Sequence, residues 1–389
     1  MKYMGHKGRM LPVLGEIIER EAHDAGKVAD PFCGSAAVSW FMAANLDVPV
    51  IAGDLQSFAS NRAAAIIERD QQVDISLAIG KWFKRANRLT GEILNHFPNH
   101  IRSVDPDLKC SATIAKQVLG SRKFCATVLP PLFAKIGGQW PISKAYGGYY
   151  FSPYQALIID ALRQTMPKQT GHRNIALAAL VEAASRCAAA PGHTAQPFQP
   201  TEGAAPYIIE AWKKNIFDYT RSAALEMAAL AAMQRGKAIT GHFSQTLDEL
   251  NSGDLVFADP PYSGVHYSRF YHVLETITRG TETEVSGRGR YPSREERPVS
   301  QFSRKSEAAE GARQLLVKCA EKELKLIVTF PTEASSNGLS ADDFIEMGTP
   351  IFSEVERELF DSNFSTLGGN QKIRDARKMC SESIIIFRP

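Results

Sequence analysis

The stretch DLVFADPPYSGVHYSRFYHVLETI, residues 254–277, joins an apolar run to a turn that regular strands do not contain. Four apolar residues, 255–258, are followed at once by Asp259-Pro260-Pro261-Tyr262. Each proline fixes φ and removes a backbone donor, so the strand ends here and its last carbonyls point at something other than a neighbouring strand. The turn therefore predicts a binding function at the carboxyl end of a strand, where parallel sheets place their sites.

These residues offer rigid groups that fit an amino group on an aromatic ring. The Asp259 carboxylate and the Pro260 carbonyl are two fixed acceptors for the two N–H donors of an exocyclic amine, and Tyr262 can stack on its ring. Such bonds draw the nitrogen towards tetrahedral geometry and localise its lone pair, as attack on an electrophilic methyl group requires. A plain strand-end turn with a solvent-facing Asp259 is the alternative, and the preceding apolar run favours the functional interpretation.

The N-terminal residues alternate between helix and strand patterns. Residues 11–23 have apolar positions at helical spacing, and a short strand before Asp30 leads through a Gly/Ser turn into an Ala-rich helix. A second apolar run ends at Asp54, and residues 63–70 continue as helix. This βαβ order favours a parallel sheet. The sheet pattern resumes after the middle of the chain, in residues 253–262, 323–331, 351–360 and 381–389.

The middle of the chain differs from both flanks. It reads as helical, with a buried helix predicted over 175–190, and residues 81–170 contain 13 Lys and Arg against 4 Asp and Glu. A basic segment attracts phosphate backbones, although a solvated Lys-rich surface would give the same count. The predicted organisation is one α/β catalytic domain formed by residues 1–79 and 236–389, interrupted by a mostly helical insert at 80–235.

Composition excludes several protein classes. The 389 residues contain no apolar run of the roughly 18 residues that a membrane span needs. The polar N-terminus has no apolar segment behind it, so no signal peptide is expected. Six cysteines lie far apart, with no CxxC pair and no Cys/His cluster at zinc spacing. Reduced thiols, a cytoplasmic location and the absence of a metal site are therefore expected.

A second motif, DPFCGS at residues 30–35, lies at the first strand-to-helix turn. Small residues let a ligand approach the backbone there, and the helix N-terminus supplies free N–H groups. Asp54, at the end of the next strand, is placed as the acid that binds ribose hydroxyls in nucleotide-binding folds. Either aspartate could instead cap a helix. Together they favour a nucleoside-containing cofactor.

DPPY with an upstream DPFCGS turn resembles the amino-methylating, S-adenosylmethionine-dependent DNA methyltransferases. The order of cofactor motif, insert and DPPY is similar to the Dam-like adenine-N6 group, whose N-terminal motif K-[WY]-x-G-x-K is matched by KYMGHK at residues 2–7. Residues 267–277, 287–291 and 364–379 also look like parts of this group. The resemblance covers both flanks, roughly 230 residues, and the middle only loosely.

The resemblance implies a Rossmann-like methyltransferase sheet with an inserted target-recognition domain. It also implies methyl transfer from S-adenosylmethionine to N6 of a flipped-out adenine in double-stranded DNA, with no metal. The cofactor site would comprise Tyr3, Lys7, Asp30, Pro31, Phe32, Cys33, Gly34, Ser35, Asp54 and Asp259. The catalytic residues would be Asp259, Pro260, Pro261 and Tyr262.

Candidate DNA-contacting residues are Tyr267, Arg269, Arg288, Arg290 and Lys144. The start of an amphipathic helix explains Tyr267 and Arg269 as well. Solvation is the alternative for Arg288 and Arg290, and a hairpin core that includes Trp140 and Tyr150 is the alternative for Lys144. Cys33 is interpreted as a packing residue, because transfer to an amino group needs no cysteine nucleophile. His272 is interpreted as structural or DNA-facing.

Two positions depart from the family pattern. Ala36 takes the place of the second glycine of the FxGxG cofactor loop, and alanine penalises positive φ. Ser263-Gly264 replaces an apolar pair after DPPY, which affects the edge of the base pocket. The first departure puts cofactor affinity in question.

Three alternatives remain beside an adenine-N6 enzyme of a restriction-modification or phage-defence system. Cytosine-N4 methylation would use the same acceptors. A non-catalytic DNA-binding subunit, with a restriction or defence partner protein, would keep the fold and the basic insert, although the intact Asp259 and Tyr262 argue against it. A nicotinamide-dependent dehydrogenase would leave DPPY unexplained and lacks GxGxxG after the first strand.

Overall fold

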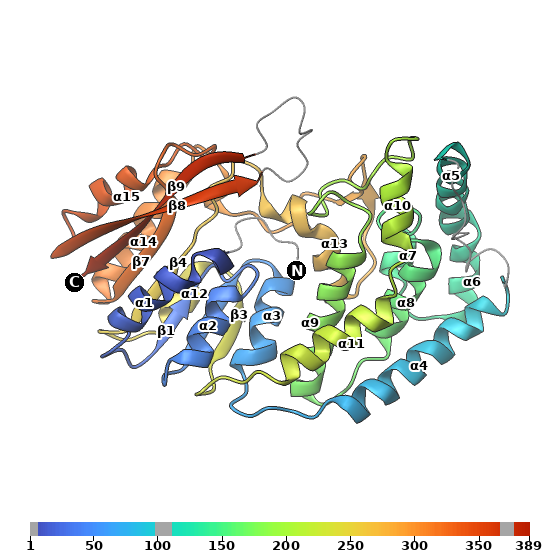
Figure 1. Cartoon of the computed structure of the whole chain (residues 1–389), viewed down its shortest axis with the longest axis horizontal. Coiled ribbons are helices and arrows are strands. Elements are labelled where there is room, and N and C mark those ends of the chain that lie inside the picture. The colour runs from blue at the N-terminus through green and yellow to red at the C-terminus, as the bar shows by residue number, and fades with distance from the viewer. Residues whose placement is uncertain (1–6, 98–110, 366–376) are drawn as a thin grey trace. The chain divides into compact units, whose positions relative to one another are not determined.

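The chain forms two compact units in a computed structural model that describes residues 7–97, 111–365 and 377–389 (Figure 1). The sheet unit comprises the described residues up to 72 together with 230–268 and 298–389. The helical unit comprises residues 73–229 and 269–297. Residues 269–297, which follow the DPPY turn, thus pack with the segment that contains most of the predicted insert.

The sheet unit contains seven strands in the order β3-β2-β1-β4-β7-β9-β8. The first five in this order are parallel, and β9 pairs antiparallel with both β7 and β8. This mostly parallel sheet confirms the predicted Rossmann-like class. The strands are β1 (Val28–Asp30), β2 (Val50–Asp54), β3 (Lys237–Thr240), β4 (Leu255–Ala258), β7 (Lys325–Pro331), β8 (Glu354–Ser365) and β9 (Arg377–Arg388).

Helices flank this sheet. Helices α1, α2 and α3 pack against one another in chain order, and α2 and α3 contact strands β1 to β3. Helices α12, α14 and α15 share an apolar core with β1, β4, β7 and β9, in which Val256, Leu315 and Phe344 are fully buried. The helices are α1 (Leu11–Glu21), α2 (Ala37–Asn45), α3 (Ser57–Ile67), α12 (Phe243–Asp248), α14 (Ala308–Glu321) and α15 (Ala341–Gly348), with 3₁₀ turns η1 (Lys7–Arg9) and η2 (Gln301–Ser303).

The predicted strands at 323–331, 351–360 and 381–389 correspond to β7, β8 and β9. Strand β3 was not predicted, because its four residues, KAIT, are exposed or half-buried and form no apolar run. It pairs through its backbone with β2 at the edge of the sheet. Backbone pairing at an edge needs no apolar sequence pattern, so this strand was invisible to hydrophobic periodicity.

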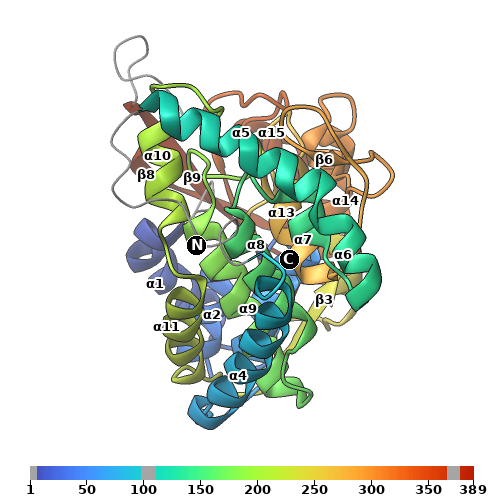
Figure 2. The same ribbon diagram turned by 90° about the vertical axis from the view of Figure 1, so that its right-hand side faces the viewer.

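The helical unit confirms the mostly helical character of the insert (Figure 2). The predicted buried helix at 175–190 corresponds to α9, which packs against α8 and α11 and is buried along most of its length. No helix among the described residues is apolar and long enough to cross a bilayer. The elements are α4 (Ser76–Leu94), α5 (Ser111–Thr127), α6 (Leu129–Ile136), α7 (Pro141–Tyr146), α8 (Pro153–Gln164), α9 (Thr170–Cys187), α10 (Ala205–Trp212), α11 (Ile216–Ala228), α13 (Tyr267–Arg279, in this unit from Arg269 onward), β5 (Val285–Ser286) and β6 (Tyr291–Pro292).

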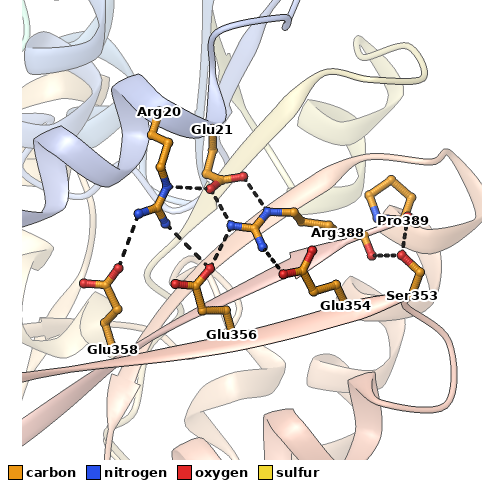
Figure 3. Close-up of polar contacts among 8 residues, drawn as sticks. All are labelled: Arg20, Glu21, Ser353, Glu354, Glu356, Glu358, Arg388 and Pro389. Carbon is orange, nitrogen blue, oxygen red and sulfur yellow. Dashed lines mark hydrogen bonds and ion pairs between the residues drawn. The ribbon is translucent and has the colours of Figure 1, made fainter.

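An ion-pair network joins α1 to the end of the sheet (Figure 3). Glu21, only 4% exposed, accepts hydrogen bonds from Arg388 Nε at 2.9 Å and Nη2 at 2.7 Å. Arg388 also pairs with Glu354 at 2.7 Å and with Glu356 at 2.8 Å. Arg20 Nε also donates to Glu21 Oε1 at 3.0 Å, but Arg20 is half-exposed. Loss of Arg388 therefore removes the bidentate partner and leaves the buried carboxylate of Glu21 with this weaker pair.

We expect Arg388→Met to lower the free energy of unfolding by about 2 kcal/mol at neutral pH. The hydrogen bonds from Arg388 hold the pKa of Glu21 below its usual range. A depressed carboxyl pKa contributes stability above the unfolded pKa, so the difference between the two proteins should shrink as pH falls below about 4. Urea unfolding as a function of pH measures this.

Glu358→Gln is the matched control, because Glu358 has a long 3.7 Å pair with the half-exposed Arg20. Its cost should stay below about 0.5 kcal/mol. Equal losses for the two variants would show that Arg388 is no more important than a surface charge.

Candidate functional site

A cavity lies at the carboxyl ends of β1, β2 and β4, within the sheet unit. Its empty volume, counted with the open solvent at its mouth, is about 1000 Å³. The chain continues from β1 to β2 on one side and from β4 to the next strand of the sheet, β7, on the other, so the strand order reverses between β1 and β4. Open α/β sheets bind ligands at such a point. The cavity walls include Lys7, the turn at 30–35, residues 54–56 and 241–243, and the DPPY turn at 259–262. The predicted catalytic and cofactor residues therefore meet here, except Tyr3, which lies outside the described residues.

The two acids of the predicted cofactor turns are held by local hydrogen bonds. Asp30 is 1% exposed; Ser39 Oγ donates to its Oδ2 at 2.6 Å and the Phe32 N–H to its Oδ1 at 3.4 Å. Burial raises the pKa of Asp30 to about 7. Asp54 accepts from the Gly34 N–H at 3.0 Å and from the Gln56 N–H at 2.8 Å, so its carboxylate ties the two turns together.

Ala36 adopts the conformation that the family glycine would favour. It has φ 62° and ψ 15°, is fully buried, and stands immediately before α2. Gly34, two residues earlier, also has positive φ, at 47°. The chain therefore retains the glycine-type loop geometry in spite of the alanine, at a strain cost of about 1–2 kcal/mol. Cys33 is buried and its thiol pKa is raised by desolvation, which fits a packing residue.

Asp259 is fixed through one of its two oxygens. Lys7 Nζ lies 3.1 Å from Oδ1, and Thr329 Oγ1 donates to the same oxygen at 3.0 Å. With the described residues, Oδ2 makes no hydrogen bond or ion pair. Burial raises the pKa of Asp259 to about 6, against the opposing charge of Lys7. Lys7 also donates to Glu382 Oε1 at 2.7 Å. Burial alone would lower the pKa of Lys7, but the charges and hydrogen bonds of Asp259 and Glu382 outweigh burial and raise this pKa.

The backbone of the DPPY turn is braced by a loop that follows β7. Asn337, 1% exposed, donates through Nδ2 to the Pro261 carbonyl at 3.1 Å and to the Phe302 carbonyl at 2.9 Å. Ser336 Oγ accepts from the Gly264 N–H at 2.9 Å, so Ser263-Gly264 is anchored by the same loop. This bracing takes the Pro261 carbonyl and leaves the Pro260 carbonyl without a partner among the described residues. The ring of Tyr262 lies beside Lys7, whose Nζ is 5.8 Å from its centroid.

An aromatic cluster forms the apolar wall of the cavity. The ring centroids of Phe32, Phe243 and Phe302 lie 5.4 to 6.1 Å apart. Gln56 lines the same cavity and is 4% exposed, and its buried Oε1 has no hydrogen-bond partner among the residues that the structure describes. A buried acceptor beside aromatic rings and an acid fits a nucleoside, which presents amino hydrogens on a flat ring and hydroxyl groups on a sugar.

Sequence reasoning missed several residues that hold this site, among them Thr329, Asn337 and Glu382. Thr329 and Glu382 lie within predicted strands. The available indication for Glu382 was an acid within the predicted strand at 381–389. Asn337 lies in a loop, and no local pattern connects it with Pro261.

A family model for the D12 class N6 adenine-specific DNA methyltransferases matches residues 3–106 and 203–330, more than half of the chain. The chain belongs to this family. It is also similar to "Modification methylase LlaI" from Lactococcus lactis subsp. lactis, with 32% identity over 110 residues. That alignment covers 28% of this chain and only 17% of the relative's length.

The D12 family match includes Asp30, Asp54, Asp259 and Thr329, and it ends before Asn337 and Glu382. The residues between its two segments, 107–202, lie in the helical unit where described. Of the residues that hold the DPPY turn from later in the chain, Thr329 therefore lies within the matched residues, and Asn337 and Glu382 lie beyond them.

The predicted DNA-contacting residues are divided between the units. Tyr267 lines the cavity. In the helical unit, Lys144 pairs with Glu282 at 2.6 Å, and Arg290 donates to the Ala145 carbonyl at 2.8 Å. Arg269 lies 4.7 Å from the ring centroid of Tyr291, and Arg288 is exposed. Trp140 and Tyr150 are fully buried, in agreement with a core role, but the segment between them forms helix α7 and not a hairpin.

His272 is also a core residue of the helical unit. It is 2% exposed, and its ring nitrogens lie 3.0 Å from the Arg269 carbonyl and 2.9 Å from the Gly289 carbonyl. Desolvation lowers its pKa to about 4, against the hydrogen bonds to the two carbonyls. This supports the structural interpretation of His272.

Substitutions at Ala36 should separate strain from packing. Ala36→Val places a β-branched side chain at positive φ in a buried position, and we expect it to lower the free energy of unfolding by at least about 2 kcal/mol. Ala36→Gly relieves the strain but loses a buried methyl group, so its effect should stay within about 1 kcal/mol. Urea unfolding of both variants measures this, and a tolerated valine would contradict the left-handed geometry.

Proposed function

We propose that this protein is a site-specific DNA methyltransferase that transfers a methyl group from S-adenosylmethionine to N6 of adenine. The observation that supports this best is the state of Asp259. Lys7 and Thr329 occupy its Oδ1, while Oδ2 and the Pro260 carbonyl make no hydrogen bond with the described residues. Two rigid acceptors beside an aromatic ring match the two N–H donors of an exocyclic amine.

The cavity residues fit the cofactor that the family implies. The turn at 30–35, Asp54 and Gln56 would hold its nucleoside part, since they supply small residues, an acid and an unpartnered acceptor. Lys7 lines the same cavity, and the proposed role of Tyr3 rests on the sequence alone. When bound, S-adenosylmethionine supplies an electrophilic methyl group. The chain itself supplies no metal-binding cluster among the described residues.

The protein's part in the reaction is to hold and activate the amine. Asp259 Oδ2 and the Pro260 carbonyl accept hydrogen bonds from the two N–H groups of the amine. Pro261 keeps the turn rigid, and Tyr262 stacks on the base. Since burial raises the pKa of Asp259 to about 6, its carboxylate is a stronger base than an exposed aspartate and can stabilise the charge that develops on the nitrogen. The base has to leave the duplex for this contact.

We propose that residues 80–235 provide target recognition, and that residues 1–79 and 236–389 provide catalysis. Double-stranded DNA would be contacted by Tyr267, Arg269, Arg288, Arg290 and Lys144. Lys144 and Arg290 already bind groups within the helical unit, which competes with DNA contact. Arg288 is therefore the strongest candidate for a DNA contact among these residues. We also propose a restriction-modification or phage-defence setting with a partner protein; the name "Modification methylase" of the Lactococcus relative supports the modification part of that setting.

The test is methyl transfer from labelled S-adenosylmethionine to mixed-sequence duplex DNA, with identification of the product nucleoside. We expect N6-methyladenine from the wild type and a loss of at least about a hundredfold for Asp259→Ala, because both the acceptor and its orientation disappear. Glu358→Gln, a surface change in β8, should behave like the wild type.

Three other outcomes would each redirect the proposal. N4-methylcytosine would assign the same site to cytosine. Tight DNA binding without transfer would favour a non-catalytic subunit. Full activity of Asp259→Ala would remove Asp259 from the reaction.

A further inference from the structure

Three buried charged groups form a chain behind the DPPY turn. Glu382 on β9 is 4% exposed and Lys7 is 6% exposed, and the side chain of Asp259 is 18% exposed. Lys7 Nζ lies 2.7 Å from Glu382 Oε1 and 3.1 Å from Asp259 Oδ1. Two carboxylates thus share one ammonium group, and the closer of them is not the one that faces the cavity.

Stability alone gives a poor explanation for Glu382. Within the described residues, the side chain of Glu382 forms a hydrogen bond and an ion pair with Lys7. Its neighbours along β9, residues 384–387, are apolar and fully buried. A buried ion pair gains little over apolar packing, because desolvation offsets the attraction. A third charge that leaves the group with a net negative charge adds to that cost.

A pair of Lys7 and Asp259 alone would differ chemically from one ammonium group shared by two carboxylates. If Lys7 faced Asp259 alone, its full charge and its hydrogen bonds would go to the carboxylate that must accept from the substrate amine. A carboxylate neutralised in this way is a weaker base and a weaker acceptor. Glu382 draws Lys7 to itself and leaves Asp259 with more of its charge.

We propose that Glu382 is a positioning residue that shares Lys7 with Asp259 and so preserves the basicity of the Asp259 carboxylate. The proposal rests on the proposed function for its catalytic meaning, but the electrostatic relation exists in the resting protein. Within residues 7–97, 111–365 and 377–389, the ionisable groups that face Asp259 are Lys7 from η1, Glu382 from β9 and Asp30 from β1. Thr329 on β7 donates to Oδ1. The negative charge of Glu382 raises the pKa of Asp259, whereas Lys7 and Thr329 lower it.

Two near-isosteric variants should therefore move the Asp259 titration in opposite directions. Glu382→Gln keeps an acceptor for Lys7 but removes the charge, so the pKa of Asp259 should fall by about one unit. Thr329→Val removes a donor to Oδ1 without changing charge, so the pKa should rise. The measurement is the pH titration of carboxyl-¹³C-aspartate signals by NMR in the full chain, with Asp259→Asn to assign the resonance.

The methyl-transfer assay provides a second readout. Only ionised Asp259 accepts from the amine, so the wild-type rate should fall as pH drops through about 6. In Glu382→Gln this acid limb should move to lower pH and the plateau rate should fall; in Thr329→Val the limb should move to higher pH. A purely structural role for Glu382 would lower the rate or the stability and leave the limb in place.

An Asp259 titration that is unmoved or raised in Glu382→Gln would overturn the proposal. If that variant does not fold, Glu382→Asp is measured instead; it withdraws the carboxylate from Lys7 and should give a smaller shift in the same downward direction. The NMR titration needs no turnover. Absent methyl transfer by the wild type would thus refute the proposed function, whereas an unmoved titration would refute the role of Glu382.

Discussion

The parallel pairing of β1 with β4 is the constraint on which the site depends. Val28 lies beside Leu255 and Ala29 beside Val256, although the two strands are far apart in the sequence. Because the strands run in the same direction, Asp30 and Asp259 leave the sheet at the same edge. The cofactor-type turn and the DPPY turn can share one cavity only because this pairing brings both strand ends together.

The last strand holds the N-terminal residues to this frame at two points. Midway along β9, Glu382 binds Lys7 at 2.7 Å; at the last residue of the strand, Arg388 binds Glu21 through two nitrogens. Strand β9 itself is fixed by its antiparallel pairing with β7, where Glu382 lies opposite Pro331. The N-terminal segment therefore brings its ammonium group to Asp259 with the help of two polar contacts to the C-terminal strand, in addition to the packing of η1 and α1 against α2.

Local patterns predicted the parts of the site that local forces determine. Apolar runs predicted β2, which ends at Asp54, and β4, which Asp259 follows, because burial of both sheet faces demands such runs. Strand β3 was missed because an edge strand can pair through its backbone alone. Thr329, Asn337 and Glu382 were missed because their roles come from register and loop packing between distant segments. Lys144 was predicted as a DNA contact from its charge, yet pairing with Glu282 depends on tertiary structure.

The two buried aspartates at the edge of the sheet differ in how their oxygens are used, and this difference separates their roles. Both have pKa values raised by burial, to about 7 for Asp30 and about 6 for Asp259, so burial alone does not distinguish them. Both oxygens of Asp30 accept hydrogen bonds from its own turn and helix. Asp259, which lines the cavity, has its partners on Oδ1, and Oδ2 has none within the part of the chain that the structure describes. A carboxylate whose two oxygens both accept hydrogen bonds from its own turn and helix stabilises that local structure. A carboxylate held through one oxygen can accept a hydrogen bond from an external donor with the other.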